Sequence, residues 1–253
     1  MTEDKKMKFV ITRDLAVKVN WILDNLIPPI LRDCRLFMKA IEYAVYGKKG
    51  TIFLDFKENG RYLHLSSAEL KTIYQEVADA STAMTRPTDL NHVMEEKVLN
   101  FFKARAGQVI KILDVACGRG YLSNEIAGIS ASFDVYGIDI IIPNISEQPE
   151  NLHFLEGEIE HIPFPDRFFD VVICTYTLEH VLNLEAALAE LRRVCKGKLI
   201  AVVPCEREYQ YTTNLHTYWF PYPHTIKRLF HNPDGKVAKW GGDFLYFESC
   251  SKS

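Results

Sequence analysis

The chain has 253 residues, of which 47% are hydrophobic and 25% charged, and its formal net charge is −3. This composition fits a globular protein with a sizeable core, and without a dominant run of Lys or Arg it gives no electrostatic support for a nucleic-acid partner. The six cysteines form no Cys-x-x-Cys pair, which indicates reduced thiols. A polar N-terminus with no signal-peptide pattern and the lack of a long apolar run predict a cytoplasmic protein without a transmembrane segment.

The N-terminal part of the chain has mainly helical patterning. Apolar residues recur at helical spacing over 12–27 and again over 30–46, with Pro28 and Pro29 interrupting the pattern between them. Residues 51–65 contain an Asn-Gly pair between two apolar stretches, which predicts two short strands joined by a tight turn.

Two more helices are expected before the pattern changes, over 66–80 and 89–105. The boundary is placed near Gly107. The predicted domains are therefore a mainly helical N-terminal cap or lid, 1–107, and a second domain, 108–253.

Beyond the cap, strand and helix patterns alternate, which is typical of an α/β fold. Five short apolar runs predict parallel strands buried on both faces, at 109–115, 133–139, 152–155, 169–174 and 198–203. Helices are expected at 121–127, 184–194 and 225–230. Residues 236–240 and 244–247 would add an antiparallel C-terminal hairpin, which makes a sheet of seven strands.

The run ILDVACGRGYLS, residues 112–123, passes from a strand through an acid and two glycines into a helix. Such a loop lets the backbone approach a ligand closely at a helix N-terminus. A third loop glycine and a Gly-Lys-Ser/Thr sequence are both missing, which disfavours a nicotinamide enzyme and a P-loop. Asp114 ends the first strand, where a carboxylate suits a cationic or hydroxyl-bearing ligand. Asp139 ends the second strand, where it can accept hydrogen bonds from paired ribose hydroxyls.

The sequence DVACGRG, residues 114–120, resembles motif I of class I S-adenosylmethionine-dependent methyltransferases, which more often have Gly at the position of Ala116. The block 151–175 is similar to the subgroup that includes ubiquinone- and menaquinone-biosynthesis methyltransferases. The resemblance covers about 109–250 and implies a Rossmann-like sheet that binds S-adenosylmethionine. The cofactor-binding residues that it implies are Asp114, Ala116, Cys117, Gly118, Gly120, Tyr121, Asp139, Ile140, Glu158, Ile159 and Thr175.

Some relatives hold a divalent metal after the fourth strand with a Glu-x-x-Glu-His motif. In this chain the first Glu position is Tyr176, so a metal would have to use Glu179, His180 and His216. This is a thin ligand set, and no resident metal is expected.

The segment 204–224 is long and rich in aromatic residues, and long loops in compact domains are usually functional. It resembles the family's substrate loop, although an aromatic plug on the sheet is an alternative. A neutral histidine is a natural base near pH 7, so His216 is the first catalytic candidate and His180 the second. The residues expected to contact substrate are Tyr218, Trp219, His224 and Arg86.

The expected function is S-adenosylmethionine-dependent O-methylation of a small molecule or of a sugar or glycan hydroxyl. N- or C-methylation of a small metabolite and a non-catalytic, cofactor-binding regulatory role stay open. The cap, which is similar to caps on methyltransferases encoded near surface-polysaccharide genes, is expected to wall the acceptor pocket and to permit a homodimer. Shallow membrane contact is the alternative for its apolar helices.

Overall fold

The computed structural model describes residues 18, 21–46, 50–80, 88–141, 148–211 and 214–250. The chain divides into two compact units, Met1–Asp89 with Tyr209–Leu215, and Leu90–Glu208 with His216–Ser253. The division falls after Asp89 and not near Gly107, because the helix expected at 89–105 packs on the sheet of the second unit. Among the residues described, no helix has the length and apolar character needed to cross a bilayer.

The second unit is built on one seven-stranded sheet with the order β3-β2-β1-β4-β5-β7-β6. All pairs are parallel except those made by β7, which runs antiparallel to β5 and β6. The strands are β1 Ile110–Val115, β2 Phe133–Asp139, β3 Leu152–Glu156, β4 Phe169–Thr175, β5 Cys195–Val203, β6 Lys236–Trp240 and β7 Asp243–Ser249. This arrangement confirms the predicted mostly parallel sheet with an antiparallel C-terminal hairpin.

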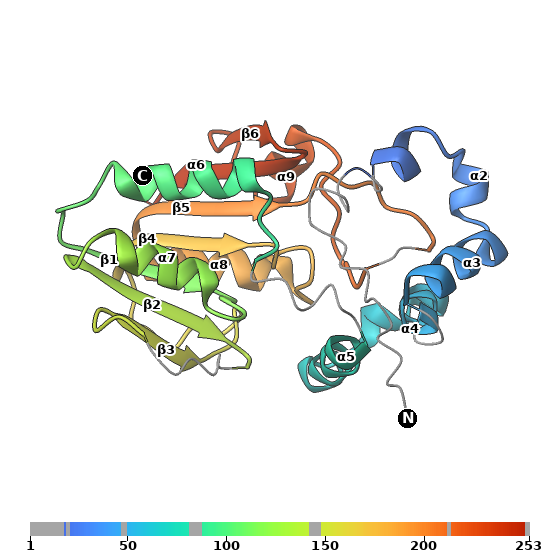
Figure 1. Cartoon of the computed structure of the whole chain (residues 1–253), viewed down its shortest axis with the longest axis horizontal. Helices are drawn as coiled ribbons and strands as arrows, with labels where there is room; N and C mark the ends of the chain where they lie inside the picture. Colours follow the sequence, from blue (N-terminus) through green and yellow to red (C-terminus); the bar gives the residue numbers. More distant parts are fainter. Residues whose placement is uncertain are drawn as a thin grey trace, which may run out of the picture. The chain divides into compact units, whose positions relative to one another are not determined.

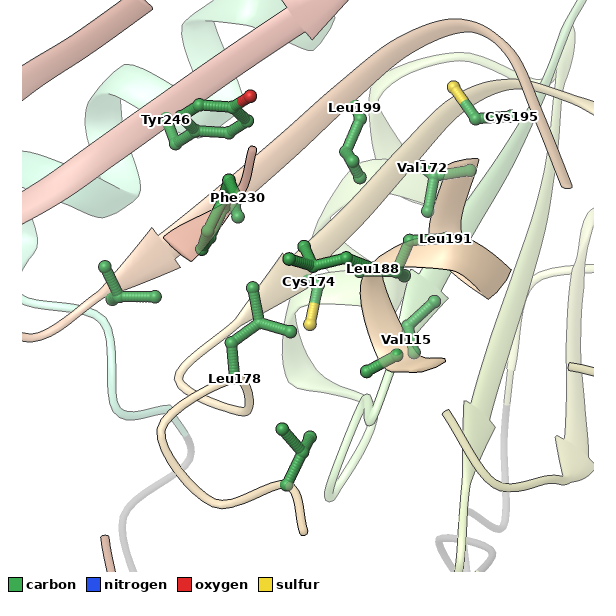
Figure 2. Packing of buried hydrophobic residues seen from close by; sticks show 14 of the residues in the cluster. Val115, Val172, Cys174, Leu178, Leu188, Leu191, Cys195, Leu199, Phe230 and Tyr246 are labelled. Atoms are coloured by element: carbon green, nitrogen blue, oxygen red, sulfur yellow. The ribbon is translucent and has the colours of Figure 1, made fainter. Parts of the chain in front are cut away.

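Helices cover both faces of the sheet. Successive strand residues point to opposite sides, so apolar neighbours in a strand pack against helices on different faces. Ile112 of β1 packs in a cluster with residues of α6 (His92–Lys103) and α7 (Tyr121–Ile129). Its neighbour Leu113 packs in a second cluster with residues of α8 (Leu184–Val194) and α9 (Pro223–Leu229). Figure 1 shows α6 and α7 on one face and α8 on the other. Figure 2 shows Leu188 and Leu191 of α8 beside Val172 and Leu199 of the sheet.

The order of the strands determines where a ligand can bind. Parallel strands lie on both sides of β1, and Val115 at its end is in register with Ile138 of β2 and Cys174 of β4. The chain therefore proceeds outward in opposite directions from β1 and β4, and the loops after these strands diverge at the carboxyl edge. In open α/β sheets, this switch point is where ligands bind.

The described residues of the first unit between 21 and 80 are mainly helical. Residues 21–25 are helical, and then come α2 (Pro29–Arg32), α3 (Arg35–Tyr46), α4 (Thr51–Lys57), the 3₁₀ helix η2 (Glu58–His64) and α5 (Ser67–Ala80). The prediction of two strands over 51–65 is wrong. Phe53 and Phe56 are three residues apart and both bury into one apolar cluster of this unit, which suits a helix and not a strand.

The segment Tyr209–Leu215, which follows β5 in the sequence, belongs to the first unit. The ammonium of Lys57 donates to the Tyr209 carbonyl at 2.9 Å, and the Gln210 amide donates to the Asp33 carboxylate at 2.7 Å. Leu215 is buried in the apolar cluster formed by α4. These contacts hold both ends of the described part of the segment within this unit.

Candidate active site

The loop between β1 and α7 is wound tightly at the carboxyl edge of the sheet. Ala116, Gly118 and Gly120 all have positive φ, at 57°, 56° and 75°. The Cys117 amide donates to the Ile138 carbonyl at 3.0 Å, which ties the loop to the end of β2. The left-handed conformation at Ala116 is costly for a residue with a Cβ, and this explains why the motif more often has Gly there.

Gly118 gives the loop an open side. A Cβ added there would meet no atom within 4 Å, and the residue is exposed. The backbone at Gly118 can therefore be approached closely by a ligand. This observation fits a nucleoside cofactor lying over the loop.

Asp114 is fully buried beneath the same loop. Its carboxylate accepts a hydrogen bond from the Ser123 hydroxyl of α7 at 2.6 Å. Burial raises the pKa of Asp114 to about 7, with a further rise from Asp139, while the Ser123 hydrogen bond lowers it. The side chain therefore joins the end of β1 to the start of α7, and it shapes the loop from below.

Asp139 is the last residue of β2, and its carboxylate binds the backbone of the loop between β1 and α7. One carboxylate oxygen accepts from the Gly118 amide at 2.8 Å, and the other accepts from the Ile141 amide at 3.0 Å. A carboxylate oxygen has more than one acceptor site, so each can accept a further hydrogen bond. Both oxygens are thus held in place at the position where paired hydroxyls of a ribose are expected.

Close packing lies behind Asp139. A Cβ on Gly137 would come within 2.7 Å of the Phe154 ring and 3.0 Å of the Cys117 sulfur. The Cys117 thiol is held well above its usual pKa, first by burial and then by the charges of Asp114 and Asp139. A raised pKa disfavours the thiolate, the form that a nucleophilic cysteine needs near neutral pH.

The predicted adenine-binding segment follows β3. The Gly157 amide donates to the Asp139 carbonyl at 3.0 Å, which brings Glu158 and Ile159 beside the end of β2. Glu158 is exposed, whereas Ile159 packs partly against the sheet cluster. Ile140, which directly follows Asp139, is half-buried.

Two other predicted cofactor residues have internal contacts. The Tyr121 hydroxyl donates to Glu95 of α6 at 2.6 Å, which raises the pKa of Tyr121 to about 12. Thr175 ends β4 at the switch point, and its carbonyl accepts from the Thr177 hydroxyl at 3.1 Å.

The loop after β4 is bound to the second half of the predicted substrate loop. The amides of Thr217 and Tyr218 donate to the Glu179 carbonyl at 2.7 and 3.1 Å, and the Thr217 hydroxyl donates to the Val181 carbonyl at 2.6 Å. The Tyr218 hydroxyl accepts from the Leu184 amide at 3.3 Å, at the start of α8. This pairing brings His216 to the loop that carries His180.

The two catalytic candidates are in direct contact. The rings of His180 and His216 are 4.6 Å apart between centroids and meet edge to face at 74°. Nδ1 of His216 lies 3.0 Å from a carboxylate oxygen of Glu206. Glu179, Glu206 and His216 are buried, and His180 is half-buried. Glu206 is not among the residues predicted from sequence; the signal that could have indicated it is its place as an acid three residues after the end of β5.

These side chains also make up a possible donor set for an ion. The ligand atoms of Glu179, His180 and His216 lie within 4.8 Å of one another. Tyr176, at the first position of the relatives' motif, has φ of 51° and donates its hydroxyl to Asp243 at 2.6 Å. Its phenol is therefore engaged with the C-terminal hairpin, and the expectation of no resident metal stays a prediction.

The other predicted substrate residues are more scattered. Trp219 is half-buried after Tyr218, while His224 is exposed on α9 with its ring stacked on Tyr222 at 5.2 Å between centroids. Arg86 lies outside the described residues.

The sheet order, the glycine loop and the acids at the ends of β1 and β2 define the Rossmann-like fold of class I methyltransferases. Residues 113–202 match the family described as a methyltransferase domain. Residues 113–202 therefore form a domain that is similar to the class I S-adenosylmethionine-dependent methyltransferases, a family whose cofactor is S-adenosylmethionine.

Two curated relatives share the family's domain. The ubiquinone biosynthesis O-methyltransferase of Rickettsia typhi is 30% identical over 123 residues, which are 45% of this chain and 49% of that protein. The ubiquinone/menaquinone biosynthesis C-methyltransferase of Stutzerimonas stutzeri is 30% identical over 151 residues, 51% of this chain and 57% of that protein. The chain thus spans about half the length of the curated relatives that it matches.

A solved structure supports the fold. The 1,6-didemethyltoxoflavin-N1-methyltransferase of Burkholderia thailandensis, bound to 1,6-didemethyltoxoflavin and S-adenosylhomocysteine, superposes with a TM-score of 0.53 at 15% identity. The match covers 72% of this chain and 87% of that one.

Proposed function

We propose that this protein transfers a methyl group from S-adenosylmethionine to a hydroxyl oxygen of a small molecule or of a sugar or glycan. The observation that carries the proposal is the contact of His216 with His180. His180 lies in the loop after β4, and β4 is the strand beside β1 and its glycine loop. A proton acceptor at this edge is needed for a hydroxyl acceptor.

The residues that would hold the cofactor surround the loop after β1. Asp139 would accept from the ribose hydroxyls, Glu158 and the Ile159 amide would meet the adenine, and the open backbone of Gly118 would face the ligand. The cofactor supplies a sulfonium methyl group that is already activated for transfer. The chain's own task is therefore to orient an acceptor, exclude water and remove a proton.

His216 is the proposed base for that proton. It is buried and lies against His180, and the backbone of the two residues after it is hydrogen-bonded to the β4–α8 loop. A hydroxyl loses its proton as the new O–C bond forms, and a neutral imidazole can take it near pH 7. The functions of the two curated relatives, O- and C-methylation in quinone biosynthesis, support a small acceptor and make phenols worth testing beside sugars.

Binding and turnover test the proposal separately. Calorimetry should show binding of S-adenosylmethionine and S-adenosylhomocysteine but not of NAD, and the two binders should raise the melting temperature by mass action. Incubation with ¹³C-methyl cofactor and a panel of phenols, sugars and amines should give an O-methyl product by NMR. An N- or C-methyl product would contradict the hydroxyl acceptor, and binding with no turnover on any acceptor would favour a regulatory protein.

A further inference from the structure

We propose that Glu206 is the positioning residue for His216, and that it holds the imidazole with Nδ1 toward the carboxylate so that Nε2 receives the proton of the acceptor hydroxyl. This inference rests on the proposed O-methyl transfer and assigns a role to an acid in the loop after β5.

The contact is short and enclosed. The Glu206 carboxylate oxygen is 3.0 Å from His216 Nδ1, and the two residues are only 9% and 7% exposed. A carboxylate removed from water interacts more strongly with a neighbouring polar group than one on the surface does. The Glu206 carboxylate is therefore a stronger influence on the imidazole than an exposed acid would be.

Both partners lie close to anchored parts of the second unit. Glu206 stands three residues beyond Val203, the last residue of β5, which is buried in the sheet core. His216 precedes Thr217, whose amide and hydroxyl both donate to the Glu179 carbonyl, at 2.7 and 3.1 Å. The sheet and the β4–α8 loop thus set the separation of the two side chains, so the pair does not depend on two mobile surface residues meeting.

The arrangement selects one protonation pattern. A carboxylate oxygen 3.0 Å from Nδ1 favours the tautomer with its proton on that nitrogen, because the negative charge stabilises the nearby N–H dipole. Nε2 is then the basic nitrogen. The same carboxylate stabilises the imidazolium that forms when Nε2 takes a proton, which is the role of the acid in a His-acid pair.

The proton and electron changes balance without another reactant. The acceptor oxygen forms a bond to the methyl carbon as the S–C bond breaks, and that electron pair stays on sulfur, which becomes a neutral thioether. The hydroxyl proton moves to Nε2 of His216. The resulting imidazolium, paired with the Glu206 carboxylate, later releases its proton to water.

Two other groups face His216 from the loop after β4. The ring of His180 meets it edge to face, and Glu179 lies within the same cluster of ligand atoms. Glu179 is the competing candidate for orienting the imidazole. Its backbone carbonyl already accepts from Thr217 and Tyr218, so a change in its side chain tests a different contact from that of Glu206.

The test uses the full-length protein saturated with S-adenosylhomocysteine and labelled with ¹⁵N-histidine. Long-range ¹H–¹⁵N NMR should show His216 with its proton on Nδ1 in the wild type, and His216→Asn identifies the signals. Glu206→Gln should shift the population toward a proton on Nε2, and Glu206→Asp should keep much of the wild-type pattern. Glu208→Gln, an exposed acid in the same loop, is the matched control and should change nothing.

Turnover gives the second readout, with catechol and methyl glucoside as acceptor probes. Glu206→Gln should lower kcat by about 100-fold or more, the usual contribution of general base catalysis, with little change in KM for the cofactor. Glu206→Asp should recover part of the loss. A wild-type proton on Nε2, or a kcat for Glu206→Gln equal to that of Glu208→Gln, would overturn the inference. Lack of turnover by the wild type would count against the proposed function, whereas the tautomer measurement would still decide the role of Glu206.

Discussion

Asp139 carries the sharpest expectation for a single residue. Its two carboxylate oxygens are fixed by the amides of Gly118 and Ile141 and face the position proposed for the ribose. Asp139→Ala should weaken S-adenosylmethionine binding by about tenfold or more, because the ribose loses a charged acceptor and the loop loses an anchor. Asp134→Ala is the control, since Asp134 is the second residue of the same strand and pairs with Lys111 at 2.7 Å. Calorimetry that finds unchanged affinity in Asp139→Ala would refute the ribose assignment.

For single residues, the sequence predicts the place in a strand or loop better than it predicts the partners of the side chain. Asp114 and Asp139 are placed correctly at the ends of adjacent strands because strand ends follow from local pattern. The hydrogen bond from Ser123 to Asp114 depends on the three-dimensional path of the loop between β1 and α7, which the sequence pattern does not specify. The contact between Glu206 and His216 could not be predicted, because nine residues lie between them in the sequence and the path of the chain depends on packing elsewhere.

The helices and strands of the second unit lie close to their predicted positions. Strands buried on both faces of a parallel sheet are short continuous apolar runs, whereas amphipathic helices repeat apolar residues every three or four positions, so the two patterns are easy to tell apart. The first unit shows where this reasoning fails. In residues 51–65, aromatic and β-branched residues favour a strand locally, but α4 buries Phe53 and Phe56 on one side in a cluster that includes the distant Leu215. The partner that stabilises the helix comes from outside the segment, so local pattern could not reveal it.

Helix α3 contains a buried acid that should control stability with pH. Burial raises the pKa of Glu42 to about 8 from 4.5, and Arg32 opposes part of this rise. The folded state therefore holds this proton more tightly than the unfolded state between these pH values. The stability it contributes is complete below pH 4.5 and is lost as pH rises through 8, by at most about 1.4 kcal/mol per pH unit.

Glu42→Gln should remove this dependence, because an amide of the same shape does not ionise. Urea denaturation at pH 5, 7 and 9 should show the variant gaining stability over the wild type as pH rises. Glu58→Gln, which alters an acid paired with Arg35 at 3.2 Å, is the surface control. Parallel pH curves for the wild type and Glu42→Gln would show that the carboxylate is hydrated in the folded protein.

The loop after β4 decides whether an ion takes part. Glu179, His180 and His216 are close enough to share an ion, but Tyr176 replaces a ligand of the relatives' motif and bonds to Asp243. Treatment with EDTA should therefore leave methyl transfer largely intact. A loss of turnover that magnesium restores in the wild type, and not in Glu179→Gln, would show that the cluster recruits a metal.

At the scale of the whole molecule, the unexpected feature is the path of the chain between Glu206 and His216. The sequence predicts one boundary near Gly107, yet Tyr209–Leu215 belongs to the first unit while the residues on either side of it belong to the second. Such a crossing joins residues more than a hundred positions apart, including Lys57 with Tyr209. A pattern with a local period carries no information about such a pairing.

His216, the proposed base, directly follows a segment that belongs to the first unit. Deletion of residues 1–85 tests whether this connection matters for methyl transfer. The deletion removes Lys57 and Asp33, which bind Tyr209 and Gln210, and the α4 cluster around Leu215. His216 directly follows Leu215, so it should lose its fixed position. Methyl transfer should be abolished, whereas cofactor affinity should fall only modestly, because Asp139 and the loop after β1 lie wholly within the second unit.

A milder variant guards against loss of folding. Phe56→Ala in the full chain leaves a cavity beside Leu215, which commonly costs about 3–5 kcal/mol locally, and it should lower kcat for methyl transfer more than it weakens cofactor binding. Leu63→Ala, which changes an exposed side chain of the same unit, is the matched control. If the truncated protein methylates its acceptor at the full rate, the first unit does not hold the base, and its exposed apolar residues would then point to partner binding.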